Sequence, residues 1–276
     1  MIDLHIHSNL SDGSLSLKEI IEKCAEKAIT AIGITDHWKT RRYDKCQCVT
    51  DIKKHIEVCN SLHDFALYYG ITVKIGLEID FSKQYGVDIP ESIIKEMDMF
   101  DYLLFEYVDT ESESWGSVCG NSIYDLVDIT KCVSIPVGLA HNDFQKNYKE
   151  NYQEIITLMC KNNIFLELCE GEPMGGKKIN SSILKNLLSA KCNMPDLSVY
   201  HQNDPINRNK HMREDKYYFE WFTEDIWETI KQKGLKISIG TDSHNGTHVG
   251  NCTKVLSYIE KYDLYDAVIF GLGMHI

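Results

Sequence analysis

The stretch Asp3-Leu4-His5-Ile6-His7 sets the interpretation of the whole chain. Residues 2–7 are predicted to form a strand, and on a strand two residues that are two positions apart point to the same side. His5 and His7 therefore form a candidate metal site, because histidine is the commonest neutral ligand for zinc, manganese or iron. A His-x-His pair also fits two imidazoles that bind nothing, so the remaining sequence has to decide between these readings.

Four more groups of His, Asp and Glu follow strand-like apolar runs. In a barrel of alternating strands and helices, the C-terminal ends of the strands converge on one face, so residues far apart in sequence can meet around metal ions. This pattern indicates a metal-dependent hydrolase. The groups are Thr35-Asp36-His37, Gly76-Leu77-Glu78, Leu139-Ala140-His141-Asn142 and Gly240-Thr241-Asp242-Ser243-His244.

Strand-like and helix-like stretches alternate along the chain, which is typical of an α/β barrel. Seven strand–helix units fit best, and no linker or internal repeat divides residues 1–276, so a single domain is expected. Ser16 is a candidate N-cap. The predicted strands are 2–7, 31–35, 73–79, 102–108, 137–140, 164–168 and 236–239, and the predicted helices are 17–28, 50–69, a short one after Pro90, 122–132, 152–161, 181–190, 224–233 and 253–260.

The alternation stops at about residues 191–222, where the sequence is polar and contains Pro195 and Pro205. Long loops in compact barrels often overhang the strand ends without disturbing the core. This segment is therefore predicted to be an insertion that serves as a lid or contacts the substrate.

Composition narrows the classes of partner. The net charge of −12 over 276 residues leaves no basic surplus for broad binding to nucleic acid or anionic membranes, so a small substrate is expected. The ten cysteines are spread singly, and Cys46-Gln47-Cys48 lacks zinc-finger spacing. With no secretory leader and no apolar stretch long enough to span a bilayer, we expect a cytoplasmic protein with reduced thiols.

The loop after the first strand adds Asp12, and Gly13 would let the backbone turn so that this carboxylate lies over the strand end. Asp-x-His-x-His-Ser, then Ser-Asp-Gly-Ser and Thr-Asp-His, resembles the start of the polymerase-and-histidinol-phosphatase (PHP) family. Glu78 resembles that family's bridging glutamate, His141 its central histidine, and Asp242-Ser243-His244 its closing Asp-x-His motif. The resemblance extends from Asp3 to His244.

This resemblance implies a distorted (β/α)7 barrel whose metal site lies at the C-terminal ends of the strands. The site would hold two or three divalent ions, with manganese, iron or zinc as candidates and magnesium as a further one. The family pattern implies one ion held by His5, His7, Glu78 and Asp242, a second that Glu78 bridges to His141, and a third held by Asp12, His37 and His244.

The chain departs from the family at the end of the fourth strand, where a histidine is common. The sequence there is Phe105-Glu106-Tyr107-Val108-Asp109. Glu106 is the predicted replacement ligand and Asp109 the alternative, since a carboxylate suits a hard divalent cation. The exchange shifts the preference away from zinc and weakens an assignment as a histidinol phosphatase.

Paired metal ions would supply a metal-bridging hydroxide and neutralise the phosphoryl charge of a phosphomonoester. His37 and His244 are the candidate catalytic residues, because either could offer a proton or positive charge to the leaving alkoxide. As metal ligands they are poorer proton donors, so a metal-bound water is favoured over them as the acid. Glu167 is expected to orient a histidine from outside the ligand set. The candidate phosphate-binding cations are Lys177, Lys178, Arg208 and Arg213, with Arg41 and Arg42 as further ones.

The expected function is therefore hydrolysis of a small phosphomonoester such as a nucleotide, a sugar phosphate or a compound like histidinol phosphate. One alternative is an amidohydrolase-like enzyme that cleaves C–N bonds, although no bridging lysine is found at a strand end. A second is an inactive metal-binding module, which would show broken ligand positions. An exonuclease of the same family is disfavoured by the acidic balance.

Overall fold

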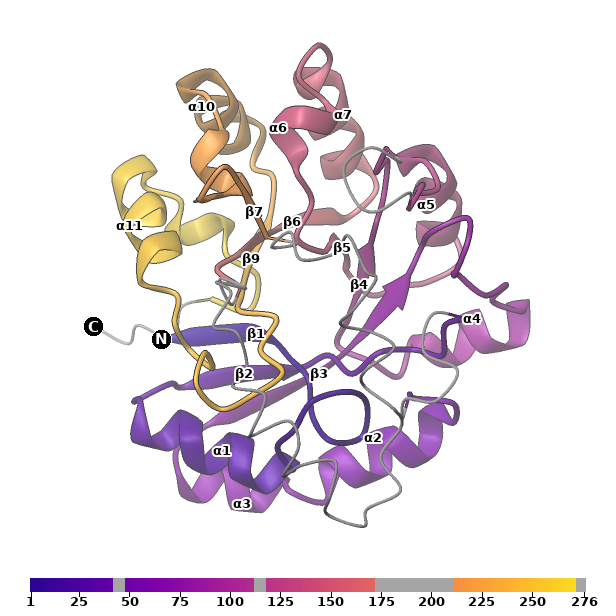
Figure 1. The fold of residues 1–276 in the computed structure, drawn as a ribbon, viewed down its shortest axis with the longest axis vertical. Coiled ribbons are helices and arrows are strands. Elements are labelled where there is room, and N and C mark those ends of the chain that lie inside the picture. Colours follow the sequence, from indigo (N-terminus) through magenta and orange to yellow (C-terminus); the bar gives the residue numbers. More distant parts are fainter. Residues whose placement is uncertain (42–47, 112–117, 172–210, 272–276) are drawn as a thin grey trace, which may run out of the picture.

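Seven parallel strands form the centre of the molecule in the computed structural model (Figure 1). The structure describes residues 1–41, 48–111, 118–171 and 211–271. Along the sheet the strands follow one another in chain order, and the helices lie around the outside of the ring. The strands of this sheet are β1 (Ile2–Ile6), β2 (Ala31–Ile34), β3 (Thr72–Asp80), β4 (Tyr102–Glu106), β5 (Val137–Leu139), β6 (Ile164–Cys169) and β9 (Ile237–Gly240).

The first and last strands meet at the C-terminal end of the barrel. Ile6 and Ser243 form an isolated parallel bridge. The amide of His7 donates to the carbonyl of Ser243 at 3.0 Å, and the amide of Ser243 donates to the carbonyl of His5 at 3.3 Å. The distorted (β/α)7 barrel expected from the sequence is confirmed, with its closing seam at the end that carries the predicted ligands.

The outer helices present apolar stripes to the strands. In α1, Leu17, Ile20, Ile21 and Cys24 are buried, and Ser16 forms a capping box with Glu19, as predicted for the N-cap. The α-helices of the described residues are α1 (Leu17–Glu26), α2 (Ile52–Asn60), α3 (His63–Tyr68), α4 (Glu91–Met97), α5 (Ile123–Thr130), α6 (Phe144–Asn147), α7 (Tyr152–Lys161), α10 (Glu224–Lys233) and α11 (Thr253–Tyr262).

Large side chains fill the interior of the barrel below the strand ends. Tyr102 and Phe165 are fully buried, and the Tyr102 hydroxyl donates to the carbonyl of Leu4 at 2.5 Å. This contact satisfies the polar end of a buried tyrosine. Because the interior is packed, any ligand has to bind above it, at the open ends of the strands.

Two predicted elements differ from the structure. The single helix expected over 50–69 is wrong: α2 ends at Asn60, where the Ser61 hydroxyl donates to the carbonyl of Val58 at 2.6 Å, and α3 begins at His63. A hydroxyl that bonds to the preceding turn competes with continuation of the helix. β4 ends at Glu106 rather than Val108, because Tyr107 has a left-handed φ of 65°.

The predicted insertion and the helix expected over 181–190 lie largely outside the described residues. From residue 211 the chain forms a two-stranded hairpin, β7 (Met212–Arg213) and β8 (Lys216–Tyr217), followed by the 3-10 helix η1 (Tyr218–Trp221). A second 3-10 helix, η2 (Tyr265–Ala267), follows α11. Within the described ranges, every helix falls short of the length and apolar character that a membrane span needs.

Candidate metal centre

The predicted ligands gather at the C-terminal ends of β1 to β5 and β9. They form three groups whose candidate ligand atoms lie within 4.8 Å of one another. Glu78 and His7 each belong to two of these groups, so the groups form one continuous cluster. The groups are His5, His7, Glu78 and Asp242; Glu78, Glu106 and His141; and His7, Asp12, His37 and His244.

The first group is fully buried and tightly spaced. The Nε2 atoms of His5 and His7 lie 3.1 Å apart, which places two ring nitrogens against each other. Oε2 of Glu78 lies 3.4 Å from His5 Nε2 and 3.2 Å from His7 Nε2. Oδ1 of Asp242 lies 3.3 Å and 2.8 Å from the same two nitrogens. Four donor atoms from β1, β3 and β9 thus face a common point.

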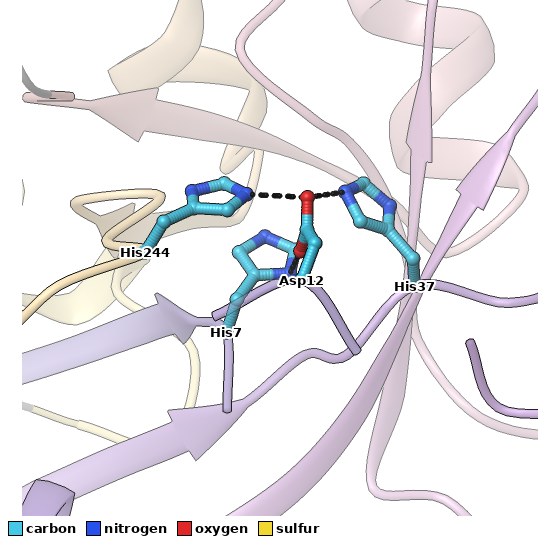
Figure 2. Close-up of side chains that lie close together, drawn as sticks. All are labelled: His7, Asp12, His37 and His244. Carbon is cyan, nitrogen blue, oxygen red and sulfur yellow. Dashed lines mark hydrogen bonds and ion pairs between the residues drawn. The ribbon is translucent and has the colours of Figure 1, made fainter. Parts of the chain in front are cut away.

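Figure 2 shows the third group, in which Asp12 lies among three histidines. Its Oδ2 is 3.1 Å from Nε2 of His244 and 3.6 Å from Nε2 of His37, and its Oδ1 is 3.6 Å from Nδ1 of His7. The two ring nitrogens of His7 therefore face different groups. The His244 side chain is 30% exposed, whereas that of His37 is 1% exposed.

The loop that carries Asp12 is held by buried hydrogen bonds. Asp36 accepts from the amide and hydroxyl of Ser8, both at 2.7 Å, and from the Ser11 hydroxyl at 2.6 Å. At Gly13 an added Cβ would lie 2.2 Å from the carbonyl oxygen of His7, so only glycine fits this close return of the chain. Asp36 thus organises the loop, a role that its place in Thr-Asp-His does not reveal.

Glu106 occupies the position where the sequence lacks the family's histidine. It lies with Glu78 and His141, whose Nε2 is 3.0 Å from Oε1 of Glu78. Asp109, the alternative, is engaged elsewhere: its Oδ2 accepts from the amide of Ile123 at 3.0 Å and from the Tyr148 hydroxyl at 2.8 Å. The structure therefore brings Glu106 to the cluster and places Asp109 at the start of α5.

The close carboxylates change the protonation of the histidines. Burial lowers the pKa of His7, but its contacts with Asp242, Glu78 and Asp12 outweigh this effect and raise the pKa to about 10. The pKa of His5 is likewise raised, against the effect of burial, by Glu167, Glu78 and Asp242. The Glu78 carboxyl shows the opposite effect. Burial raises the pKa of Glu78, but the surrounding histidines outweigh burial and hold this pKa well below its usual range.

Glu167 on β6 contacts the cluster from outside. Its Oε1 lies 2.7 Å from Nδ1 of His5, on the far side of the ring from the nitrogen that faces Glu78 and Asp242. A carboxylate in this position fixes the orientation of a ligating imidazole. The structure thus places Glu167 where an orienting partner was expected.

Two residues of the cluster have left-handed backbone conformations. Asp242 has a φ of 46° and His141 a φ of 29°, values that cost energy in residues with a Cβ. Such strain persists only where the surrounding structure enforces it, and it concentrates at functional sites. The amide of His141 donates to Oε2 of Glu167 at 2.7 Å, which helps to hold that strained position.

Most of the predicted phosphate-binding cations cannot be placed. Lys177, Lys178 and Arg208, together with Arg42, lie outside the described residues. Arg213 lies on β7, with its Nε 3.6 Å from Oδ2 of Asp143 and its guanidinium 4.4 Å from the ring centre of Trp221. Arg41 is exposed. Of these cations, Arg213 alone is described beside the cluster's strand ends, since Asp143 follows directly on His141 and Asn142.

His211 was not assigned a role from the sequence, yet it lies against the cluster. Its side chain is 4% exposed, and its Nε2 is 3.0 Å from Oδ2 of Asp242. It follows a long polar stretch rather than an apolar run, so the strand-end pattern that identified the other residues gives no signal here.

Comparison with known protein families shows to which family the chain belongs. The model of the PHP domain matches residues 3–171, more than half of the sequence. The chain belongs to the PHP domain family. This assignment supports the expected class of activity, a metal-dependent phosphoric ester hydrolase. The matched region contains every predicted ligand except Asp242 and His244.

Two solved structures of histidinol phosphatases share the fold over most of the chain. A histidinol phosphate phosphatase from Lactococcus lactis, solved with zinc, L-histidinol and phosphate, is 16% identical with a TM-score of 0.57, covering 95% of this chain and 93% of that one. A putative histidinol phosphatase from Listeria monocytogenes is 12% identical with a TM-score of 0.55, covering 92% and 99%. At this identity the likeness establishes a common fold.

A curated relative matches a shorter region. The DNA polymerase/3'-5' exonuclease PolX of Bacillus subtilis is 28% identical over 97 residues, which are 35% of this chain. The match spans 17% of the length of that relative. It therefore concerns one part of a much longer protein.

Proposed function

We propose that this PHP domain protein is a metal-dependent phosphoesterase that hydrolyses a small phosphomonoester. The observation that carries the proposal is the position of Glu78, which offers one carboxylate oxygen to His5 and His7 and the other to His141. A carboxylate shared in this way suits two divalent ions held side by side, the arrangement common in phosphatases.

The spacing of the first group fits a bound ion. Four ligands placed tetrahedrally at about 2.1 Å from a metal lie roughly 3.4 Å from one another. The distances that join the ring nitrogens to each other and to the two carboxylates range from 2.8 to 3.4 Å. His5, His7, Glu78 and Asp242 would thus hold one ion, and Glu78, Glu106 and His141 a second.

Asp12, His37 and His244, with His7 beside them, would hold a third ion. The donor set of nitrogen and carboxylate oxygen, without thiolate, suits manganese, iron or zinc. Bound divalent ions supply charge neutralisation of the phosphoryl oxygens and an activated water at neutral pH. His244, the more exposed of the two candidate catalytic histidines, is better placed than His37 to reach the leaving-group oxygen of a substrate.

A cavity that adjoins a small recess lined by His141 supports a small leaving group. It has a volume of about 620 Å³, within the range of small-molecule pockets, and its lining includes Lys83, Tyr124 and Asn151. Thr110 and Asn147 line both this cavity and a smaller recess beside His141. A phosphate at the cluster would thus extend its organic part toward the loops that follow β4 and β5.

The candidate substrates are nucleotides, sugar phosphates and compounds like histidinol phosphate. The L. lactis neighbour was solved with L-histidinol and phosphate, which makes the third class a reasonable member of any substrate panel. Glu106 stands where the family commonly has a histidine. This difference argues against assigning the substrate of the L. lactis enzyme to this protein.

The test is release of inorganic phosphate from such a panel by protein loaded with manganese, iron or zinc. His7→Ala should abolish release and lower the metal content, because His7 serves two groups. His63→Ala, an exposed histidine on α3, is the matched control and should behave like the wild type. Full metal content with no phosphate released from any substrate would overturn the proposal and favour C–N bond hydrolysis or a non-catalytic metal module.

A further inference from the structure

We propose that His211 is a positioning residue of this centre, which fixes the carboxylate of Asp242; the inference rests on the proposed function. Asp242 uses its two oxygens differently. Oδ1 faces the histidines of β1, at 3.3 and 2.8 Å, whereas Oδ2 lies 3.0 Å from Nε2 of His211. This polar contact engages Oδ2 and leaves Oδ1 directed at the ion site.

Contacts from several parts of the chain fix the position of the His211 ring. Its backbone carbonyl accepts from the amide of Tyr218 at 3.1 Å, which ties it to the start of η1. Its ring packs edge to face on His141, with centroids 5.0 Å apart. An added Cβ at Gly171 would lie 1.9 Å from Cδ2 of His211, so the ring occupies space that only glycine leaves open. Three separate parts of the chain thus hold this imidazole in place.

Asp242 needs such support because its own backbone is strained. With a φ of 46°, the residue lies in the left-handed region, and its carboxylate orientation is not fixed by regular strand geometry. Carboxylates that ligate metals are commonly hydrogen-bonded in turn, and loss of that partner weakens metal binding. His211 supplies the polar partner of Oδ2 of Asp242, as Glu167 supplies the partner of Nδ1 of His5.

His211, the residue before β7, also links the β7–β8 hairpin to the centre. On the same hairpin, Arg213 pairs with Asp143 at 3.6 Å, and the indole of Trp221 donates to the Arg213 carbonyl at 3.1 Å. The hairpin is therefore anchored to the loop that follows β5, through Asp143 and through the contact of His211 with His141. His211, directly before β7, contributes to the centre itself, beyond the covering role expected for the insertion.

The experiment compares His211→Ala with His211→Gln in the full chain, with metal content and manganese affinity as readouts. Glutamine places an amide N–H near the position of Nε2 and keeps the donor. His211→Ala should keep the number of ions bound at saturation but lower affinity about 10- to 100-fold, and His211→Gln should restore most of it. His63→Ala, at an exposed histidine on α3, is the control and should keep wild-type affinity.

Several outcomes would overturn the inference. Wild-type affinity in His211→Ala would remove the positioning role, and loss of one ion per chain at saturation would make His211 a direct ligand instead. If His211→Ala does not fold, Gly171→Ala provides a second test, because it displaces the ring without removing the imidazole and should lower affinity similarly. Since metal affinity is measured without substrate, absence of phosphatase activity would not be mistaken for failure of this inference.

Discussion

Nδ1 of His5 lies 2.7 Å from Oε1 of Glu167, a contact between the first and sixth strands of the barrel. The other oxygen of Glu167 accepts from the amide of His141, also at 2.7 Å. One buried carboxylate therefore sets the ring of one proposed ligand and the backbone of another. The arrangement of the proposed ligands thus depends on a residue outside the ligand set.

Glu167→Gln should lower manganese affinity about 10- to 100-fold while the barrel stays folded. An amide retains one acceptor oxygen, so it cannot serve both His5 and His141, and it lacks the charge that favours donation by Nδ1 of His5. Equilibrium dialysis measures the affinity, and thermal unfolding of the same samples controls for loss of structure. Unchanged affinity would show that the His5 ring is held by packing alone.

Glu106→Gln and Asp109→Asn form a matched pair. Glu106→Gln should lower the number of ions bound per chain, because it weakens the donor set of Glu78, Glu106 and His141. Asp109→Asn should leave metal content intact and lower the free energy of unfolding by about 1 kcal/mol, since Asp109 accepts hydrogen bonds from Ile123 and Tyr148. Elemental analysis and urea unfolding distinguish the two; the reverse pattern would favour Asp109 as the ligand.

Binding of an ion should release protons. In the metal-free protein the pKa of His7 is about 10, so its imidazole is protonated at pH 7, whereas a ligand must be neutral. Affinity should therefore rise from pH 7 to pH 9. Titration calorimetry in two buffers of different ionisation enthalpy counts the protons, and a value of zero at pH 7.5 would contradict the raised pKa.

The same shift predicts how the metal-free protein responds to alkali. A histidine whose pKa is raised on folding stabilises the fold fully below pH 6.5, and this stabilisation is lost as pH rises through about 10. Metal-free protein should thus lose stability between pH 6.5 and 10. Metal-loaded protein should lose less, because the ion takes the place of the proton. Urea unfolding of both forms across this range is the measurement.

Asp3→Asn should lower the free energy of unfolding by roughly 1 to 3 kcal/mol. The buried Asp3 carboxylate accepts from the amides of His5, Thr241 and Gly250 and from the Thr241 hydroxyl. In the asparagine variant the side-chain N–H₂ replaces one of these acceptor oxygens and would face hydrogen-bond donors. It therefore helps to join β1 to β9.

The loss of unfolding free energy caused by Asp3→Asn should also depend on pH. Burial raises the pKa of Asp3 from 3.8 to about 6, despite the hydrogen bonds that lower it. A carboxyl with a raised pKa contributes less stability as pH rises from 3.8 through 6, because the folded state then loses its extra proton. Unfolding measured at pH 4.5 and pH 7 should show the larger deficit at pH 4.5, and an equal deficit would exclude the shift.

Local patterns predicted most of the barrel because its strands and outer helices follow regular periods. Helices 152–161 and 224–233 begin and end where expected, since each has an apolar stripe and clear boundaries. The break between α2 and α3 was missed because it depends on the Ser61 hydroxyl rather than on the apolar pattern.

The strand-end pattern also explains which residues of the centre the sequence predicts and which it does not. Residues such as Glu78 and Asp242 follow strands, so topology brings them together, and the structure does gather them. His211 reaches the centre through a hairpin whose position depends on Arg213, Trp221 and Gly171, and these are tertiary contacts that no spacing encodes. Glu106 was identified only because a family pattern marked its position.

The seam that joins Ile6 to Ser243 has a consequence for synthesis on the ribosome. The His-x-His pair at the end of β1 leaves the ribosome before β9, so a nascent chain carries this pair before Asp242 and His244 have been made. We expect the first proposed ion site to stay incomplete until β9 docks on β1, so a nascent chain without β9 should bind an ion there more weakly than the folded protein.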